Sequence, residues 1–295
     1  MRTFETKVQY NGFEIGEFTD IAHRTLEETL LLVDAFPWQE NQMQETDILT
    51  FPSVTIENNS GNYLKLGCNY SREYQFYFVS EGSLYVNMVN GMDSVADIIE
   101  HFFCDKDLTP FFRKDILHFL VKRHFVAKEF AYRIRWYKEI IFAILPLLAI
   151  CAAIIILISG GNIFLTLFAF VVPFSFGSGL LFFQLTYLVQ SFGRTISISR
   201  GVDLFEYGFR NKMKKYSKSQ IKRIRNYQCS GSRNIFGFFT ATLIEFNDGD
   251  SILINSTLIS DMTLHDKFRW INKIRTIERA FPRIIIGETI YGVKY

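Results

Sequence analysis

The sequence of 295 residues predicts an α+β membrane protein with a soluble domain on each side of a two-helix transmembrane hairpin. Two uncharged, apolar stretches, 140–158 and 163–192, are each long enough to cross a hydrocarbon core about 30 Å thick as a helix. Residues 1–112 hold 18 acidic and 6 basic side chains, whereas the remainder holds 12 acidic and 26 basic ones. We therefore expect four segments, with the boundaries 1–110, 111–138, 139–192 and 193–295.

The connection between the two apolar stretches, residues 159–162, is so short that the helices must form a tight hairpin. Both ends of such a hairpin emerge on the same side of the bilayer. Basic side chains crowd the outer flanks, 113–138 and 194–225, and none lies in the connection. The positive-inside rule then places both termini in the cytoplasm. Gly177 and Gly179 permit close helix approach, within the hairpin or in a homo-oligomer.

Proline and aromatic residues mark the expected spans. Pro146 and Pro173 predict kinks whose freed carbonyl groups a neighbouring helix satisfies. A gate is the alternative, and it is disfavoured because no ionisable side chain accompanies these prolines. Trp136, Tyr137 and Tyr187 predict an aromatic belt at the cytoplasmic interface.

The acidic segment 1–110 predicts an α+β cytosolic domain. Residues 25–28 (TLEE) form a capping box, which predicts a helix over 25–36, and residues 92–103 predict a second, amphipathic helix. Four strand-like runs joined by short turns predict an antiparallel meander: 53–57, 63–70, 74–80 and 83–89.

Three acidic residues recur at helical spacing along the second expected helix: Asp93, Asp97 and Glu100. A solvated helix face is the plainer explanation, and nothing nearby completes a metal site. The strong negative charge of residues 1–112 would repel anionic lipid and nucleic acid and attract a basic protein. These three residues are therefore the candidate partner-binding residues.

The segment 111–138 interleaves basic side chains with Phe, Leu, Ile and Val. This pattern predicts a basic amphipathic juxtamembrane helix that lies on, or rises from, an anionic leaflet. Nucleic-acid binding also combines basic and aromatic residues. The segment leads directly into a membrane span, however, so we expect the lipid bilayer and no nucleic acid as its partner.

Beyond residue 193 the sequence predicts strands followed by one helix. An Asp-Gly pair at 248–249 lies between the alternating runs 240–246 and 251–256 and is typical of a β-hairpin. Apolar residues of 261–281 recur at helical spacing and predict a closing helix. The tail, 283–295, predicts an extra strand.

A resemblance to a known family lies within residues 193–281, in the runs ISISRGVDLFEYG, SKSQIKRIR, LIEFNDGDSILINSTLIS and DMTLHDKFRWINKIRTIE. These runs resemble the bacterial pleckstrin-homology-like domains that follow a pair of membrane spans. The resemblance implies a curved antiparallel sheet with a capping helix, and binding in place of catalysis. Together with the spans, it implies a multi-pass protein of a bacterial inner (cytoplasmic) membrane.

Basic residues also cluster in this domain. They are candidates for binding acidic lipid headgroups, with ordinary positive-inside sequence as the alternative. The cluster consists of Lys212, Lys214, Lys215, Lys218, Lys222, Arg223 and Arg225.

The sequence predicts no enzyme. It contains no nucleophile elbow, phosphate loop or zinc-protease motif, and its four cysteines lie far apart, so we expect no catalytic residue, metal or cofactor. We expect a membrane-anchored binding protein, and the acidic domain favours an immunity protein that captures a toxin. The alternative is a lipid-sensing or scaffold protein that acts through the C-terminal domain. A transporter is disfavoured by the uncharged spans.

Overall fold

The computed structural model of the chain consists of two compact units. The first contains residues 1–129 and 199–202, and the second contains residues 130–198 and 203–295. The first unit therefore extends past the expected boundary at residue 110. The structure describes residues 2–39, 49–69, 73–115, 121–159, 163–229, 236–271, 273–279, 282, 285–286 and 289–290.

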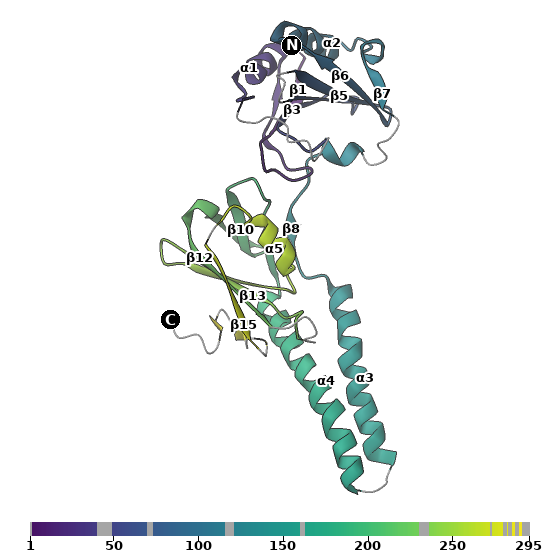
Figure 1. Ribbon diagram of the computed structural model, residues 1–295, viewed down its shortest axis with the longest axis vertical. Helices are drawn as coiled ribbons and strands as arrows, with labels where there is room; N and C mark the ends of the chain where they lie inside the picture. Colours follow the sequence, from purple (N-terminus) through teal and green to yellow (C-terminus); the bar gives the residue numbers. More distant parts are fainter. Residues whose placement is uncertain are drawn as a thin grey trace. The chain divides into compact units, whose positions relative to one another are not determined.

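An antiparallel sheet with the strand order β2-β1-β3-β4-β5-β6-β7 forms the first unit (Figure 1). The four strands of the expected meander are present and pair in chain order, as β3 to β6. Three strands extend the sheet at its edges. The strands are β1 (Phe4–Gln9), β2 (Thr19–Arg24), β3 (Ser53–Glu57), β4 (Tyr63–Cys68), β5 (Tyr74–Ser80), β6 (Ser83–Val89) and β7 (Arg113–Asp115).

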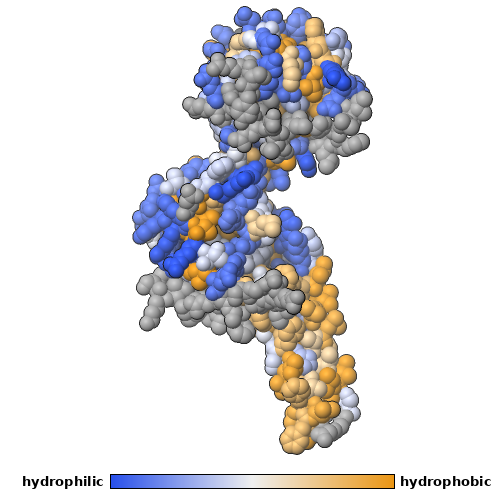
Figure 2. Space-filling view, viewed as in Figure 1, coloured by the Kyte–Doolittle hydropathy of each residue, from blue (hydrophilic) through white to orange (hydrophobic). Residues whose placement is uncertain are grey.

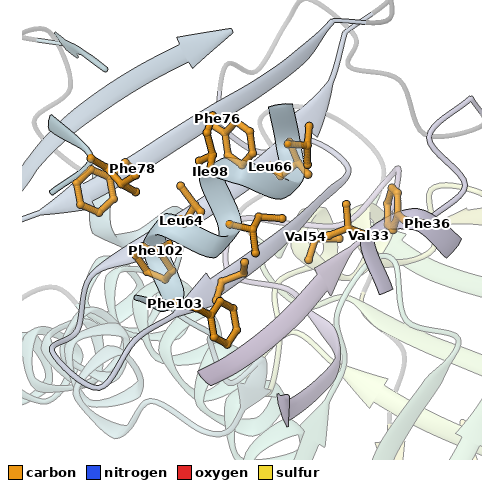
Figure 3. Packing of buried hydrophobic residues seen from close by; sticks show 14 of the residues in the cluster. Val33, Phe36, Val54, Leu64, Leu66, Phe76, Phe78, Ile98, Phe102 and Phe103 are labelled. Atoms are coloured by element: carbon orange, nitrogen blue, oxygen red, sulfur yellow. The ribbon is translucent and has the colours of Figure 1, made fainter. Parts of the chain in front are cut away.

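Two helices, α1 (Leu26–Ala35) and α2 (Met92–Phe103), cover one face of this sheet. The predicted capping box is present, because the Thr25 hydroxyl accepts from the Glu28 amide and the Glu28 carboxylate accepts from the Thr25 amide. Figure 3 shows α2 residues such as Phe102 packed over strand residues such as Leu64 and Phe78. These apolar faces supply the hydrophobic core that stabilises the unit.

The expected juxtamembrane helix over 111–138 is wrong for the residues that the structure describes. In its place are β7, the 3-10 turn Val121–His124 and β8 (Ala131–Tyr132), and the helix begins only at Trp136. Strand pairing of β7 with β6 and of β8 with β9 satisfies the backbone here. Two apolar residues of the pattern, Phe112 and Phe125, are buried inside the first unit and do not face a leaflet.

Two four-stranded sheets form the second unit. Their orders are β11-β10-β9-β8 and β14-β13-β12-β15. The expected start of this domain at residue 193 is corrected, since β8 lies before the hairpin and pairs with β9. The strands are β9 (Arg194–Ser197), β10 (Leu204–Phe209), β11 (Lys212–Ser217), β12 (Ile221–Cys229), β13 (Ala241–Phe246), β14 (Ser251–Asn255) and β15 (Ile274–Arg279).

The hairpin helices are inserted between β8 and β9. They are α3 (Trp136–Ser159) and α4 (Ile163–Ser191), which lie side by side along their length (Figure 1). Pro146 and Pro173 lie inside the helices as expected. Residues 160–162 of the predicted connection lie outside the described residues.

The expected closing helix over 261–281 is too long. Helix α5 covers only Asp261–Lys267, and the following Ile274–Arg279 forms β15, which pairs in parallel with β12. Ile274, Thr276 and Ile277 are β-branched and suit a strand, so sheet pairing overrides the helical spacing. In the tail, β16 (Ile285–Ile286) pairs with β17 (Thr289–Ile290), and residues 291–295 lie outside the described residues.

Candidate functional site

The C-terminal part of α4 packs against the sheet formed by β12 to β15. Leu180 and Tyr187 of α4 are buried in one cluster with Phe239, Leu243 and Leu253. The rings of Tyr187 and Phe239 meet edge to face at 5.3 Å. Tyr187 is fully buried, so its predicted place in an aromatic belt is wrong. The sheet therefore covers the face of α4 that carries Tyr187.

Buried polar side chains join the end of α4 to β14. The Gln190 amide donates to the carbonyl oxygen of Leu253 at 2.9 Å, and the Ser191 hydroxyl donates to Asn255 Oδ1 at 2.7 Å. Asn255 Nδ2 in turn donates to the carbonyl oxygen of Tyr187 at 2.9 Å. Tyr187 lies near the C-terminal end of α4, so this bond ties β14 to the backbone of the helix.

The two helices of the hairpin approach closely at Gly177. A Cβ atom at this position would lie 2.6 Å from the carbonyl oxygen of Pro146, whereas a Cβ atom at Gly179 would meet nothing within 4 Å. Nearer the sheet, Gln184 Nε2 donates to the carbonyl oxygen of Glu139 at 2.7 Å. Gly177 therefore serves the packing of the hairpin, and a proline carbonyl lies directly opposite it.

Away from the sheet, the helices expose apolar side chains over most of their surface. Both are long and apolar enough to cross a membrane, and little of either apolar segment is buried. Figure 2 shows mainly hydrophobic colour along the helices. The exposed side chains include Ile155 at 66%, Phe164 at 82% and Phe168 at 72% of their full surface. This arrangement differs from a soluble core helix, which is mostly buried.

Most of the second unit, including the hairpin, matches a known sequence family. A family model of a PH domain matches residues 125–267. This part of the chain is a PH-like domain. The match begins before β8 and includes both hairpin helices, in agreement with the strand pairing that joins β8 to β9. No curated protein and no solved structure matches the chain.

The basic cluster of the PH-like domain is divided between two sheets and is largely paired with carboxylates. Lys214 bonds to Asp250 at 2.5 Å, and this hydrogen bond raises the pKa of the lysine and lowers that of the aspartate. Glu245 accepts a hydrogen bond from Arg223 and forms an ion pair with Arg225. Lys215 lies near Glu206, Lys218 begins a 3-10 turn, and Lys212 and Lys222 are exposed without an ion pair to any residue that the structure describes. The seven residues do not form one free surface.

The candidate partner-binding residues of the first unit are also separated. A groove of about 490 Å³ runs between α1 and α2 and is lined mainly by apolar atoms. Asp93 lines this groove together with Glu27 and Asp34, whereas Asp97 and Glu100 are exposed outside it. None of the described residues that line the groove is basic. Sequence spacing along α2 could not show the contribution of α1.

A buried lysine that the sequence analysis missed lies on the other face of the first unit's sheet. Lys65 Nζ donates to Gln9 Oε1 and to the carbonyl oxygen of Leu49, each at 2.8 Å. Burial, and secondarily the charge of Lys7, lowers the pKa of Lys65 to about 7. The hydrogen bond from this buried amine links β4 to the backbone at Leu49. Its sequence signal is a lysine inside the apolar run YLKLGC. No group of three or more metal-binding side chains occurs in the described part of the chain.

Proposed function

We propose that this protein is a non-enzymatic, membrane-anchored binding protein whose hairpin holds the PH-like domain at a membrane surface. The main support for this proposal is the exposed apolar surface of α3 and α4 beyond the sheet. Leaving one Leu, Ile or Phe side chain in water in place of an apolar medium costs about 1.5–3 kcal/mol. A bilayer removes this cost for many side chains at once.

The polar contacts of the second unit support an orientation in which the sheet end of the hairpin lies outside the bilayer. The buried bonds of Gln190, Ser191 and Asn255 occur only at the end of α4 that meets the sheet. The positive-inside rule places that end, and both termini, in the cytoplasm. We further propose a bacterial inner membrane, on the resemblance described above.

The test compares two double variants of exposed apolar residues. Leu148→Asp/Ile155→Asp places carboxylates on the hairpin, and Leu204→Asp/Met262→Asp places them at similarly exposed positions of the PH-like domain. Each Asp at a span centre costs about 2.5–3.5 kcal/mol of insertion free energy. Only the hairpin variant should therefore leave the carbonate-resistant membrane fraction. Equal behaviour of the two variants would contradict the anchor.

For the partner, we propose a basic amphipathic helix of another protein, received in the groove between α1 and α2. The floor is apolar, Leu31 beside it is 64% exposed, and Glu27, Asp34 and Asp93 carry the charge of its rim. An amphipathic helix with Lys or Arg beside its apolar stripe complements both features. A toxin is one partner of this chemistry, but no relative supports an immunity function.

A synthetic helix of leucine and lysine at amphipathic spacing is the probe for this groove. Binding to the full chain in detergent should weaken at high salt, and Glu27→Lys/Asp34→Lys/Asp93→Lys should abolish it. Asp97→Lys/Glu100→Lys is the control, because these residues lie on α2 outside the groove. If both variants weaken binding alike, the whole acidic domain attracts the peptide and the groove has no role.

The alternative, lipid sensing through the basic cluster, has weaker support. Asp250, Glu206 and Glu245 already pair with four of its seven members. Surface ion pairs are individually weak, but they reduce the charge available to a headgroup. Lys212 and Lys222 remain for such a role. Salt-sensitive liposome binding that Lys212→Ala/Lys222→Ala removes would favour this alternative.

A further inference from the structure

The chain between β12 and β13 presents an exposed aromatic ring next to the hairpin. Residues 236–239, which we call the aromatic turn, have the sequence Phe-Gly-Phe-Phe and belong to the second unit. Phe239 is buried in the cluster that covers α4, whereas Phe238 exposes 69% of its surface. The sequence from 236 to 244 contains no charged residue. An exposed ring that continues an apolar surface is typical of a surface covered by an apolar partner.

The aromatic turn packs against both helices of the hairpin. The ring of Phe142 in α3 meets those of Phe238 and Phe239 edge to face, with ring centres 5.7 Å apart in each pair. The ring of Phe236 meets that of Phe183 in α4 in the same way, also at 5.7 Å. The aromatic turn therefore lies at the level of Phe142 and Phe183 along the hairpin.

The length of α3 determines where this level lies in a bilayer. The uncharged stretch 140–158 contains 19 residues and rises about 28 Å at ~1.5 Å per residue. A hydrocarbon core about 30 Å thick must therefore enclose the whole stretch, and tilting the helix shortens its projection further. The boundary of the core then lies at Glu139, whose carbonyl oxygen accepts from Gln184 of α4. Phe142 lies three residues beyond Glu139, about 4–5 Å inside this boundary.

We propose that the aromatic turn inserts Phe238 into the acyl-chain region of the bilayer, beside Phe142 of α3. The partner is the hydrocarbon of the lipid, whatever its headgroup. The inference rests on the proposed function, because it requires the hairpin to span a membrane. It adds a third element of the second unit that enters the hydrocarbon, from a strand connection and not from a spanning helix. The gain comes from removing an exposed phenylalanine ring from water.

The test measures the quenching of tryptophan emission by brominated acyl chains in nanodiscs that hold the full chain. Trp136→Phe/Trp270→Phe is the parent, in which the buried Trp38 supplies a constant emission. To this parent Phe238→Trp adds an indole at the aromatic turn. An indole at this exposed position keeps an aromatic ring next to Phe142.

Two further variants of the same parent serve as controls. Leu148→Trp places an indole near the middle of the stretch 140–158, where Leu148 is 61% exposed. Asn247→Trp places one at the exposed turn at the other end of β13. The six residues of β13 separate that turn from the aromatic turn by about 20 Å at ~3.3 Å per residue.

Depth in the bilayer predicts a different result for each position. Bromines near the headgroup end of the acyl chains should quench the indole at 238 more than bromines near the chain ends, and the indole at 148 should show the reverse order. The indole at 247 should keep its emission. Equal quenching at 238 and 247 would overturn the proposal. So would an indole at 238 that no bromine reaches, whether water or a second copy of the chain surrounds it.

The indole at 148 reports on the hairpin alone. Quenching at 148 without quenching at 238 keeps the membrane anchor and removes the aromatic turn from the hydrocarbon. Absence of quenching at 148 contradicts the spanning hairpin itself, and the insertion of Phe238 with it.

Discussion

The side-chain amide of Asn255, at the end of β14, donates a hydrogen bond to the backbone carbonyl oxygen of Tyr187 in α4 at 2.9 Å. Both residues are buried, so water cannot replace this bond. Asn255→Ala should therefore lower the free energy of unfolding by about 1–3 kcal/mol. Thermal unfolding of the full chain in detergent measures the change. Asn247→Ala, at an exposed turn of the same hairpin, should have little effect.

The close approach of α3 and α4 predicts opposite results at two neighbouring glycines. Gly177→Ala places a methyl group 2.6 Å from the Pro146 carbonyl oxygen and should destabilise the hairpin by about 1–3 kcal/mol. Gly179→Ala meets no atom within 4 Å and should be neutral or slightly stabilising, because alanine favours a helix. Thermal stability in one detergent compares the two variants. A larger loss at Gly179 would contradict the helix packing.

Lys65 predicts a pH dependence of stability in the first unit. The folded chain releases the Lys65 proton near pH 7, whereas the unfolded chain holds it to about pH 10.5. Folding therefore removes the Lys65 proton in this interval, and the free-energy cost of that removal falls as the pH rises. Relative to Lys65→Met, the wild-type chain should gain up to about 2.7 kcal/mol between pH 7 and pH 9, at 1.36 kcal/mol per unit.

Urea unfolding measures this gain in a Trp136→Phe/Trp270→Phe background, where the buried Trp38 alone reports on the first unit. Lys106→Met, at an exposed position, controls for the loss of a lysine. If the stability difference between wild type and Lys65→Met is the same at pH 7 and pH 9, the folded chain keeps the Lys65 proton throughout this interval and burial does not lower its pKa.

Local signals in the sequence predicted the elements whose ends they define. The capping box at Thr25 and the Asp-Gly turn at 248–249 depend on neighbouring residues only, and both elements form. Prediction from the sequence failed where a distant strand supplies the hydrogen-bonding partner. Residues 113–115 and 274–279 have helical or amphipathic spacing, yet pairing with β6 and β12 makes them strands.

The candidate site also has features that local sequence predicts and features that depend on distant residues. The length and apolarity of the hairpin depend on composition and were predictable, whereas the burial of Tyr187 depends on a sheet formed about forty to seventy residues later. The groove between α1 and α2 joins Asp34 and Asp93 across the fold, and no spacing rule connects them. Lys65 appeared only as one lysine among apolar neighbours, because its acceptors come from three distant segments.

The most direct test of the membrane hairpin is the labelling of single cysteines in intact cells. Ser159→Cys places a thiol at the end of α3, and Lys106→Cys places one in the first unit, in a background without the native cysteines. A membrane-impermeant maleimide should label the thiol at 159 from outside the cell and the thiol at 106 only after lysis. Exclusion of the reagent from position 159 until lysis, or labelling of both positions in intact cells, would contradict a hairpin with cytoplasmic domains.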